Sequence, residues 1–248
     1  MRSPAVILAI AGLGAMLASG CGSGGGAAPP PTYCRVRMAN MAPGIAATDM
    51  SAGGHKIGVH LAFGTASGYV TLATSTVSFR AYQPDTTVLL ADDAQGVPLA
   101  PDRDYTCFLH GPIGGAYSVN AVVIDDRAAV PANKAKIRFF HLAPDLSAKV
   151  RVILDASNYY NVEQYDMTND YQEYAPGTYN TLCRLASDTT GALAQAQMQF
   201  LAGQRYTLVF SGVSSGGPAY RLIQLVDSLP SAPQPGPFPT APEHLARR

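Results

Sequence analysis

The chain has no tryptophan, few charged side chains and, over its 248 residues, a formal net charge of zero. It contains no run of basic residues interleaved with aromatics, so we do not expect nucleic acid to be a partner. It also lacks the C-x₂₋₄-C spacing of zinc sites and the D-x-[DN]-x-[DN]-G loop that binds calcium. We therefore expect no metal and no cofactor. Glycine, proline and tyrosine are abundant instead, which suits an exported protein built from short strands and turns.

Residues 1–20 have the features of an export signal: one positive charge, the apolar run Ala5–Leu17, and small residues before Cys21. The apolar run is too short to span a membrane. The segment resembles a bacterial lipobox, although Ala18 stands where leucine is preferred, and the resemblance implies that Cys21 becomes the lipidated N-terminus. An ordinary secretory signal with an incidental cysteine is the alternative. Gly22 in place of aspartate implies an outer-membrane location if the host is Gram-negative.

Both ends of the expected folded part have the composition of unstructured chain. Residues 21–33 are rich in glycine and then in proline, which predicts a tether that is flexible and then extended. We expect it to hold the folded part away from a lipid surface, so the membrane is a partner through the anchor. Residues 229–248 are rich in proline and without periodicity, and are predicted to be a disordered tail.

One segment of the chain occurs twice. Arg35–Pro43 returns as Lys136–Pro144, and Asp104–Gly111 returns as Arg205–Gly212 at the same offset. Two landmarks that keep one offset indicate a duplicated domain, because solenoid repeats recur every ~20–50 residues. The shared feature is the packing pattern, whereas most polar residues differ between the copies.

Strict alternation dominates both copies, as in Ala194–Phe200, where it predicts that Ala196, Met198 and Phe200 face a core. About seven short strands in each ~100-residue copy predict a two-sheet sandwich. The expected strands lie near residues 35–41, 57–61, 68–72, 77–82, 88–91, 105–109 and 117–124, and near 136–142, 149–154, 171–174, 179–185, 193–201, 206–210 and 220–226.

The predicted fold class is all-β, with two tandem immunoglobulin/transthyretin-like β-sandwich domains at residues 34–128 and 134–228. Tyr105, two places before Cys107, resembles the tyrosine corner of immunoglobulin-like domains, and Tyr206 repeats it without the cysteine.

Several motifs resemble those of the bacterial domain-of-unknown-function family 4397. They are Arg35–Gly44 and its copy Lys136–Asp145, the FG-x-x-SGY segment Phe63–Tyr69, Pro176–Tyr179, and the two Tyr-Thr segments. The first copy departs from the pattern with Asn40 where histidine is usual. The resemblance implies an exported, often lipid-anchored β-sandwich protein, frequently with tandem copies, and no established activity.

Three cysteines remain if Cys21 is lipidated. A bridge between Cys34 and Cys107 is the preferred pairing in an oxidising compartment, and Cys183 stands alone. The second copy has Ala135 and Leu208 at the positions of the first two, so a bridge would not be a property of the domain type.

No catalytic residue is expected, and the chain is not predicted to be an enzyme. Ser214 lies in a G-x-S-x-G segment, but a strand pattern follows it instead of the helix that a nucleophile elbow requires. A glycine-rich hairpin turn explains the segment. His141 is replaced by Asn40 in the first copy, which favours a structural role, such as a hydrogen bond to Asp145 that shapes the turn.

Tyrosines are concentrated in residues 159–179, and three of them, Tyr159, Tyr160 and Tyr165, are the candidate binding surface. Each tyrosine offers an apolar face and a hydroxyl, which suits sugars or protein surfaces. Core packing is the competing explanation. The leading hypothesis is a non-enzymatic, lipid-anchored cell-envelope protein with a structural or recognition role and an envelope protein or glycan as partner. The alternative is a carbohydrate-binding module of the envelope that uses residues 159–179.

Overall fold

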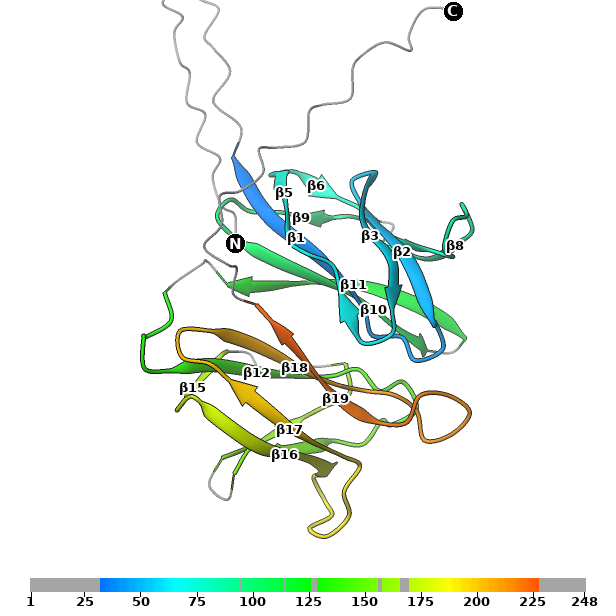
Figure 1. Cartoon of the computed structure of the whole chain (residues 1–248). Coiled ribbons are helices and arrows are strands. Elements are labelled where there is room, and N and C mark those ends of the chain that lie inside the picture. The colour runs from blue at the N-terminus through cyan, green and yellow to red at the C-terminus, as the bar shows by residue number, and fades with distance from the viewer. Residues whose placement is uncertain are drawn as a thin grey trace, which may run out of the picture. The chain divides into compact units, whose positions relative to one another are not determined.

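The computed structural model is all-β, and it describes residues 32–93, 95–113, 115–125, 129–155, 158–165 and 170–227 (Figure 1). The expected signal segment 1–20, Cys21, nearly all of the tether and the tail 229–248 lie outside these residues. Within the described part, no helix is long and apolar enough to cross a membrane.

The first half contains strands β1 to β11. They are β1 (Tyr33–Asn40), β2 (Ala47–Ala52), β3 (His55–Ala62), β4 (Thr65–Ala66), β5 (Val70–Ala73), β6 (Thr76–Val77), β7 (Phe79–Tyr82), β8 (Leu89–Asp92), β9 (Val97–Pro98), β10 (Asp104–Ile113) and β11 (Ala116–Asp125). The second half contains β12 (Ala135–His141), β13 (Val150–Ile153), β14 (Tyr159–Val162), β15 (Gln172–Tyr174), β16 (Gly177–Leu185), β17 (Ala194–Phe200), β18 (Arg205–Ser211) and β19 (Arg221–Val226).

The two halves have matching sheets. One sheet of the first half has the order β11-β10-β1-β4, with β5 also paired to β1, and its counterpart has the order β19-β18-β12-β15. The other sheets have the orders β3-β2-β7-β8 and β14-β13-β16-β17. The central pair is parallel in both halves, and Arg35 lies opposite Asp104 as Lys136 lies opposite Arg205. The repeat in the sequence therefore corresponds to a repeat in strand order and in register.

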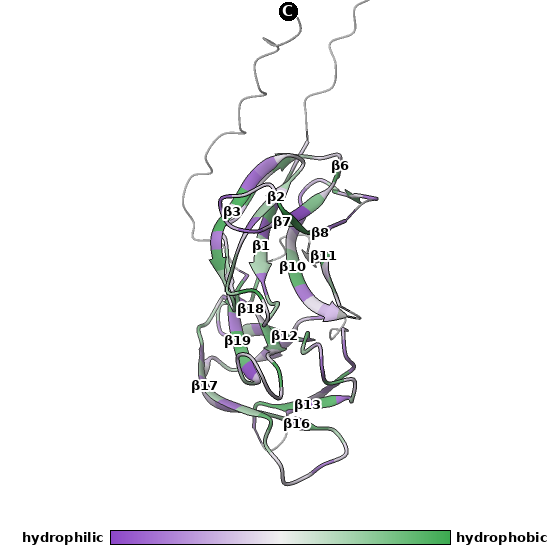
Figure 2. Cartoon of the chain, turned by 90° about the vertical axis from the view of Figure 1, so that its right-hand side faces the viewer, coloured by the Kyte–Doolittle hydropathy of each residue, from purple (hydrophilic) through white to green (hydrophobic). Residues whose placement is uncertain are grey.

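Each half has its own apolar core, to which both of its main sheets contribute. In the first half, Val36 from one sheet and Phe79 from the other are fully buried in the same cluster. In the second half, Met198 and Phe200 of β17 are buried and Ala196 packs against the same cluster. The alternation expected for this strand is confirmed, and Figure 2 shows similar alternation of hydropathy along other strands.

Each half has a tyrosine near the start of the second strand of its parallel pair, Tyr105 in β10 and Tyr206 in β18, and both tyrosines accept the same kind of hydrogen bond. The Ala100 amide donates to the Tyr105 hydroxyl at 2.8 Å, and the Leu201 amide donates to the Tyr206 hydroxyl at 2.8 Å. Both tyrosines are buried. A tyrosine hydroxyl bonded to backbone a few residues upstream is the geometry of a tyrosine corner, as the sequence predicts.

Two strands longer than two residues were not predicted. Ala47–Ala52 has the sequence Ala-Thr-Asp-Met-Ser-Ala, which is poor in the β-branched and aromatic residues that favour strands. It forms β2 because it pairs with β3 on one side and β7 on the other. Tyr159–Val162 is a short edge strand that pairs with β13 alone. Both strands form hairpins with a strand adjacent in sequence, β3 for β2 and β13 for β14, so pairing makes them strands although neither has a long alternating pattern.

A third apolar cluster joins residues of the two halves. Its buried members are Ala39, Met41 and Phe108 from the first half, and Phe140, Leu142, Val209, Ile223 and Leu225 from the second. The rings of Phe108 and Phe140 lie 5.2 Å apart. Strand β1 therefore buries both faces, because Val36 and Met38 pack in the first core while Ala39 packs in this third cluster.

Candidate functional site

A buried carboxylate, Asp227, links the two halves through hydrogen bonds. It is fully buried and forms an ion pair with Arg37, whose Nη1 also donates to the Val226 carbonyl at 2.6 Å. The Thr207 hydroxyl donates to Asp227 at 2.6 Å and the Tyr171 hydroxyl at 2.7 Å. The charge of Asp227 is thus satisfied by groups from both halves.

The arginine in this network is repeated. Arg37 Nε donates to Thr106 Oγ1 at 2.9 Å, and Arg138 Nε donates to Thr207 Oγ1 at 3.0 Å. Each guanidinium also lies over a tyrosine ring, Tyr69 for Arg37 at 4.8 Å and Tyr171 for Arg138 at 4.7 Å. Tyr69 closes the FG-x-x-SGY segment, so the motif supplies a ring for a buried arginine.

Burial raises the pKa of Tyr69 and of Tyr171 far above the ordinary value, so both hydroxyls stay protonated. A second ion pair extends the network, since Arg35 binds Asp104 through two hydrogen bonds of 2.7 and 2.5 Å. Arg205 Nη2 lies 3.9 Å from the same carboxylate. These groups are inaccessible to a ligand, and their arrangement serves to hold strands together.

His141 has the structural role that its replacement by Asn40 suggests, but its partner is different. Its Nδ1 accepts from the Ala143 amide at 3.4 Å, and its Nε2 lies 3.3 Å from the Ala148 carbonyl. Asn40 Oδ1 likewise accepts from the Ala42 amide, at 3.1 Å. The expected bond to Asp145 is wrong, because that carboxylate binds elsewhere.

Asp145 binds the G-x-S-x-G segment. Its Oδ2 accepts from both the amide and the hydroxyl of Ser214 at 2.7 Å, and its Oδ1 accepts from the Tyr220 hydroxyl at 2.8 Å. The segment connects β18 to β19, which pair as an antiparallel hairpin, so the hairpin-turn interpretation is confirmed. The serine hydroxyl donates to a carboxylate and lies on no strand-to-helix turn.

The preferred Cys34–Cys107 bridge is not formed: Cys34, Cys107 and Cys183 are all buried and outside any disulfide. The register explains the outcome, because Cys107 lies opposite Met38 in the parallel pair β1–β10. Cys34 is four residues before Met38, a separation of ~13 Å along a strand. Disulfides require Cα atoms within ~7 Å.

The candidate tyrosines do not share one surface. Tyr159 is 54% exposed, with the Arg151 guanidinium 4.7 Å from its ring centre. Tyr160 points the other way and packs on Phe139 at 4.7 Å, because adjacent residues of a strand face opposite sides. Tyr165, at a φ of 58°, packs against His110 of the first half at 5.1 Å. Of the three, only Tyr159 presents its ring to solvent.

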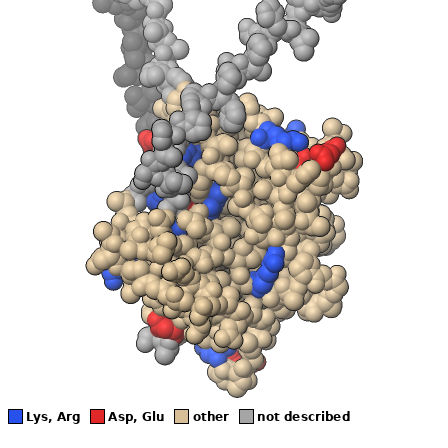
Figure 3. Space-filling view, in the orientation of Figure 1, with Lys and Arg blue, Asp and Glu red and all other residues tan. Residues whose placement is uncertain are grey.

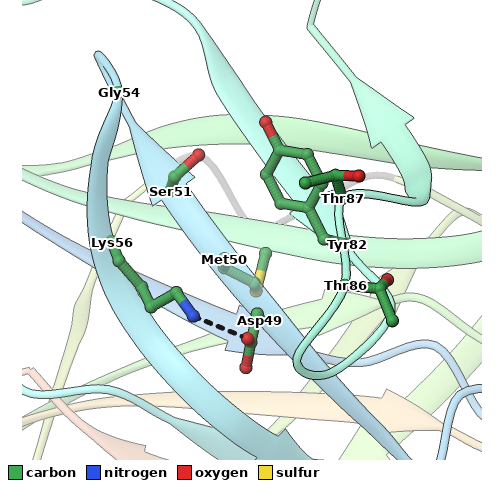
Figure 4. Close-up of a pocket in the computed structure, with 8 residues that line it drawn as sticks. All are labelled: Asp49, Met50, Ser51, Gly54, Lys56, Tyr82, Thr86 and Thr87. Atoms are coloured by element: carbon green, nitrogen blue, oxygen red, sulfur yellow. Dashed lines mark hydrogen bonds and ion pairs between the residues drawn. The ribbon is translucent and has the colours of Figure 1, made fainter.

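A concave site lies on the outer face of the sheet β3-β2-β7-β8 and has a volume of about 340 Å³ (Figure 4). Its lining residues are Asp49, Met50, Ser51, Gly54, Lys56, Tyr82, Thr86 and Thr87. Charged side chains are sparse on the face of the molecule that Figure 3 shows. A pocket lined by an ion pair, Lys56 with Asp49, is therefore unusual on this protein.

The register explains how these side chains meet. Asp49 lies opposite Tyr82 in the pair β2–β7, and Ser51 lies opposite Lys56 in the pair β2–β3. Met50, between them on β2, is fully buried and packs in the first core. Thr86 and Thr87 come from the loop between β7 and β8. The pocket was not predicted from the sequence, since most of its residues lie on or beside the unpredicted strand β2.

Asp49 is the electrostatic centre of the pocket. It accepts from Lys56 Nζ at 2.8 Å, from the His60 amide at 2.8 Å and from the Asp85 amide at 3.2 Å. Burial alone would raise the pKa of Asp49, but these hydrogen bonds outweigh it and lower the pKa to about 2. The bond to Asp49 in turn raises the pKa of Lys56. Both groups are therefore charged at every physiological pH.

Potential metal ligands adjoin the pocket: one ligand atom each of Asp49, His60 and Asp85 lie within 4.8 Å of one another. His60 Nε2 is 2.8 Å from the Asp85 carboxylate. Because the Lys56 ammonium already binds Asp49, a divalent cation would have to displace it. We assign no metal to this cluster.

In the described part of the second half, the strands that correspond to β2 and β7 carry different side chains. The buried pair Met50–Ala81 corresponds to Val152–Cys183, which places Arg151 and Arg184 where the first half has Asp49 and Tyr82. The cation of Arg151 is directed instead to the ring of Tyr159. The outer faces of the two corresponding sheets therefore differ in charge and in shape.

These features define an all-β protein whose two halves share strand order and a buried arginine on a tyrosine ring. The model of DUF4397, a domain of unknown function, matches residues 34–152, as the motifs of the first copy indicate. The match runs through the first half and into β13.

No curated protein of described function matches the chain. A leucine-rich repeat protein from Bacteroides thetaiotaomicron VPI-5482 aligns at 10% identity, covering 75% of this chain and 26% of that one, with a TM-score of 0.19. The chain thus spans about a quarter of that protein's length, and the score is too low to support any argument about fold or function.

Proposed function

We propose that the chain is a non-enzymatic, lipid-anchored cell-envelope protein in which two tandem immunoglobulin/transthyretin-like sandwiches, residues 34–128 and 134–228, form a scaffold for recognition. One observation carries this proposal. Hydrogen bonds common to both halves, those of Tyr105 and Tyr206 and of Arg37 and Arg138, all serve packing. In the first half, by contrast, polar groups line an open pocket, and the described strands of the second half carry Arg151 and Arg184 in place of Asp49 and Tyr82.

The absence of a repeated catalytic arrangement motivates the non-enzymatic part. Ser214 and His141 both have structural partners, and neither contacts the other's partners. A broad hydrolase screen on the purified protein should give no turnover. Turnover that is abolished by Ser214→Ala or His141→Ala would refute this part of the proposal.

The anchor rests on residues 1–21 of the sequence. Metabolic labelling with palmitate should label the wild-type chain and not the Cys21→Ser variant, and the variant should leave the membrane fraction. Labelling that persists in the variant, or a wild-type chain that is never labelled, would identify an ordinary secretory signal. In a Gram-negative host, fractionation should recover the labelled chain in the outer membrane.

Recognition is tested in the native envelope. A photo-crosslinking amino acid at Thr87, beside the pocket, should capture an envelope protein or glycan. The same group at Gln195, exposed on β17 of the other half, is the matched control. Equal yields from both positions, or none from either, would count against a recognition role.

A further inference from the structure

We propose that the pocket on the sheet β3-β2-β7-β8 binds an uncharged sugar ring. This inference rests on the recognition role proposed above and specifies the chemical class of ligand. It places the sugar on the first half and away from the tyrosine-rich segment 159–179.

The charges around the pocket disfavour an ionic ligand. Lys56 is compensated by Asp49 at 2.8 Å, and Arg80, on the same face of β7, is compensated by Asp92 at 3.3 Å. Asp85 adds a third carboxylate beside His60. An anion would meet these carboxylates, and a cation would have to displace the Lys56 ammonium. A neutral ligand incurs neither cost.

The hydrogen-bonding groups suit hydroxyls. Lys56 Nζ has three N–H groups, and one of them is directed to Asp49. Among the described residues, the hydroxyls of Ser51 and Thr87 have no protein partner, and each can donate or accept. Thr86 differs, since its hydroxyl donates to the Gln83 carbonyl at 3.0 Å and accepts from the Val88 amide at 3.1 Å. A sugar ring presents hydroxyls of the same dual capacity around its edge.

The apolar part of the pocket suits the C–H faces of a sugar. Tyr82 forms one wall, opposite Lys56 (Figure 4). An aromatic ring beside polar groups offers both kinds of contact that a sugar needs. The volume of about 340 Å³ lies at the small end of ligand sites, roughly 300–1,000 Å³, which favours one or two rings over an enclosed chain.

The test uses the full chain purified in detergent. The probes are cellotriose, chitotriose, maltotriose and mannotriose, measured by saturation-transfer NMR, with calcium chloride and sodium phosphate measured by calorimetry. At least one trisaccharide should bind. Its affinity should fall about tenfold or more in Tyr82→Ala, which removes a wall, and in Ser51→Arg, which fills the pocket.

Tyr159→Ala, on the corresponding sheet of the second half, is the matched control and should bind like the wild type. Circular dichroism and the thermal midpoint establish that each variant is folded, and Thr87→Val provides a milder change with the same expected direction. The proposal is overturned if no trisaccharide binds, if folded Tyr82→Ala and Ser51→Arg bind normally, or if Tyr159→Ala abolishes binding. It is also overturned if calcium or phosphate binds while sugars do not. None of these results alters palmitate labelling of Cys21 or crosslinking from Thr87, so failure here is distinguishable from failure of the proposed function.

Discussion

Removal of the buried carboxylate of Asp227 should destabilise the whole folded unit. In Asp227→Ala, the Arg37 guanidinium, only 5% exposed, loses its counter-charge, and the hydroxyls of Thr207 and Tyr171 lose their acceptor. Breaking one side of a buried ion pair costs about 3–5 kcal/mol, mostly because the other charge stays buried and unpaired. For a folded unit of this size, that loss lowers Tm by roughly 6–20 °C.

The measurement is urea unfolding with a linear extrapolation, in which the midpoint falls and the slope m stays unchanged. Asp92→Ala is the matched control, because it removes a carboxylate from a partly exposed pair with Arg80 and should cost about 0–1 kcal/mol.

A double variant makes the test sharper. Arg37→Met together with Asp227→Leu removes both charges and should be more stable than either single variant, since no unpaired charge remains. Two results would show that the pair is not buried as described. One is a loss of less than about 1 kcal/mol in Asp227→Ala, and the other is a double variant whose loss of unfolding free energy equals the sum of the two single losses. The halves would then not be joined through this carboxylate.

Three further predictions concern single groups. Burial lowers the pKa of His110 to about 4, below the unfolded value of about 6.5. The contribution of His110 to the free energy of unfolding is therefore fully present above pH ~6.5, and about 3 kcal/mol of it is lost as the pH falls to ~4. The variant His110→Gln should flatten the pH dependence of the urea midpoint. The thiols of Cys34, Cys107 and Cys183 are buried, and burial raises the pKa of Cys183 to about 12, so Ellman's reagent should react with these three thiols only after denaturation; a protected pair in the denatured, unreduced chain would indicate a disulfide. Tyr105→Phe and Tyr206→Phe each leave a backbone amide without its acceptor and should each cost about 1–2 kcal/mol in chemical unfolding, and a much larger loss in one than in the other would show that the two corners are not equivalent.

Features that depend on local pattern were predictable from the sequence. The alternation of Ala194–Phe200 gives its buried face directly, and the Tyr-x-Cys spelling led to the corner formed by Tyr105. Features that depend on register were not. Whether Cys34 can reach Cys107 is decided by which residue of β1 lies opposite Cys107, and that residue is Met38.

The pocket was hidden for the same reason. Asp49, Lys56 and Tyr82 are spread over three strands, and one of these strands has no strand-like composition. Only the pairings of β2 with β3 and β7 bring them together. The one signal in the sequence was Asp49, a charged residue within the otherwise uncharged run Ala47–Ala52, and a buried charge requires a partner.

Packing between the halves limits where recognition can occur. Two sheets bury residues on both faces: the one that contains β1 and β10, and the one that contains β12 and β18. In each, one face packs on the core of its own half, and the third apolar cluster covers the other face. Among the described residues, the four-stranded sheets β3-β2-β7-β8 and β14-β13-β16-β17 contribute no residue to this cluster. On the outer faces of these two sheets the halves differ most, with Asp49 and Tyr82 in one and Arg151 and Arg184 in the other. In a duplicated scaffold, the residues common to both copies are used for packing, so a specific ligand can be acquired only on the faces left free. A change at Asp49 or Tyr82 should therefore alter ligand binding without altering the contact between the halves.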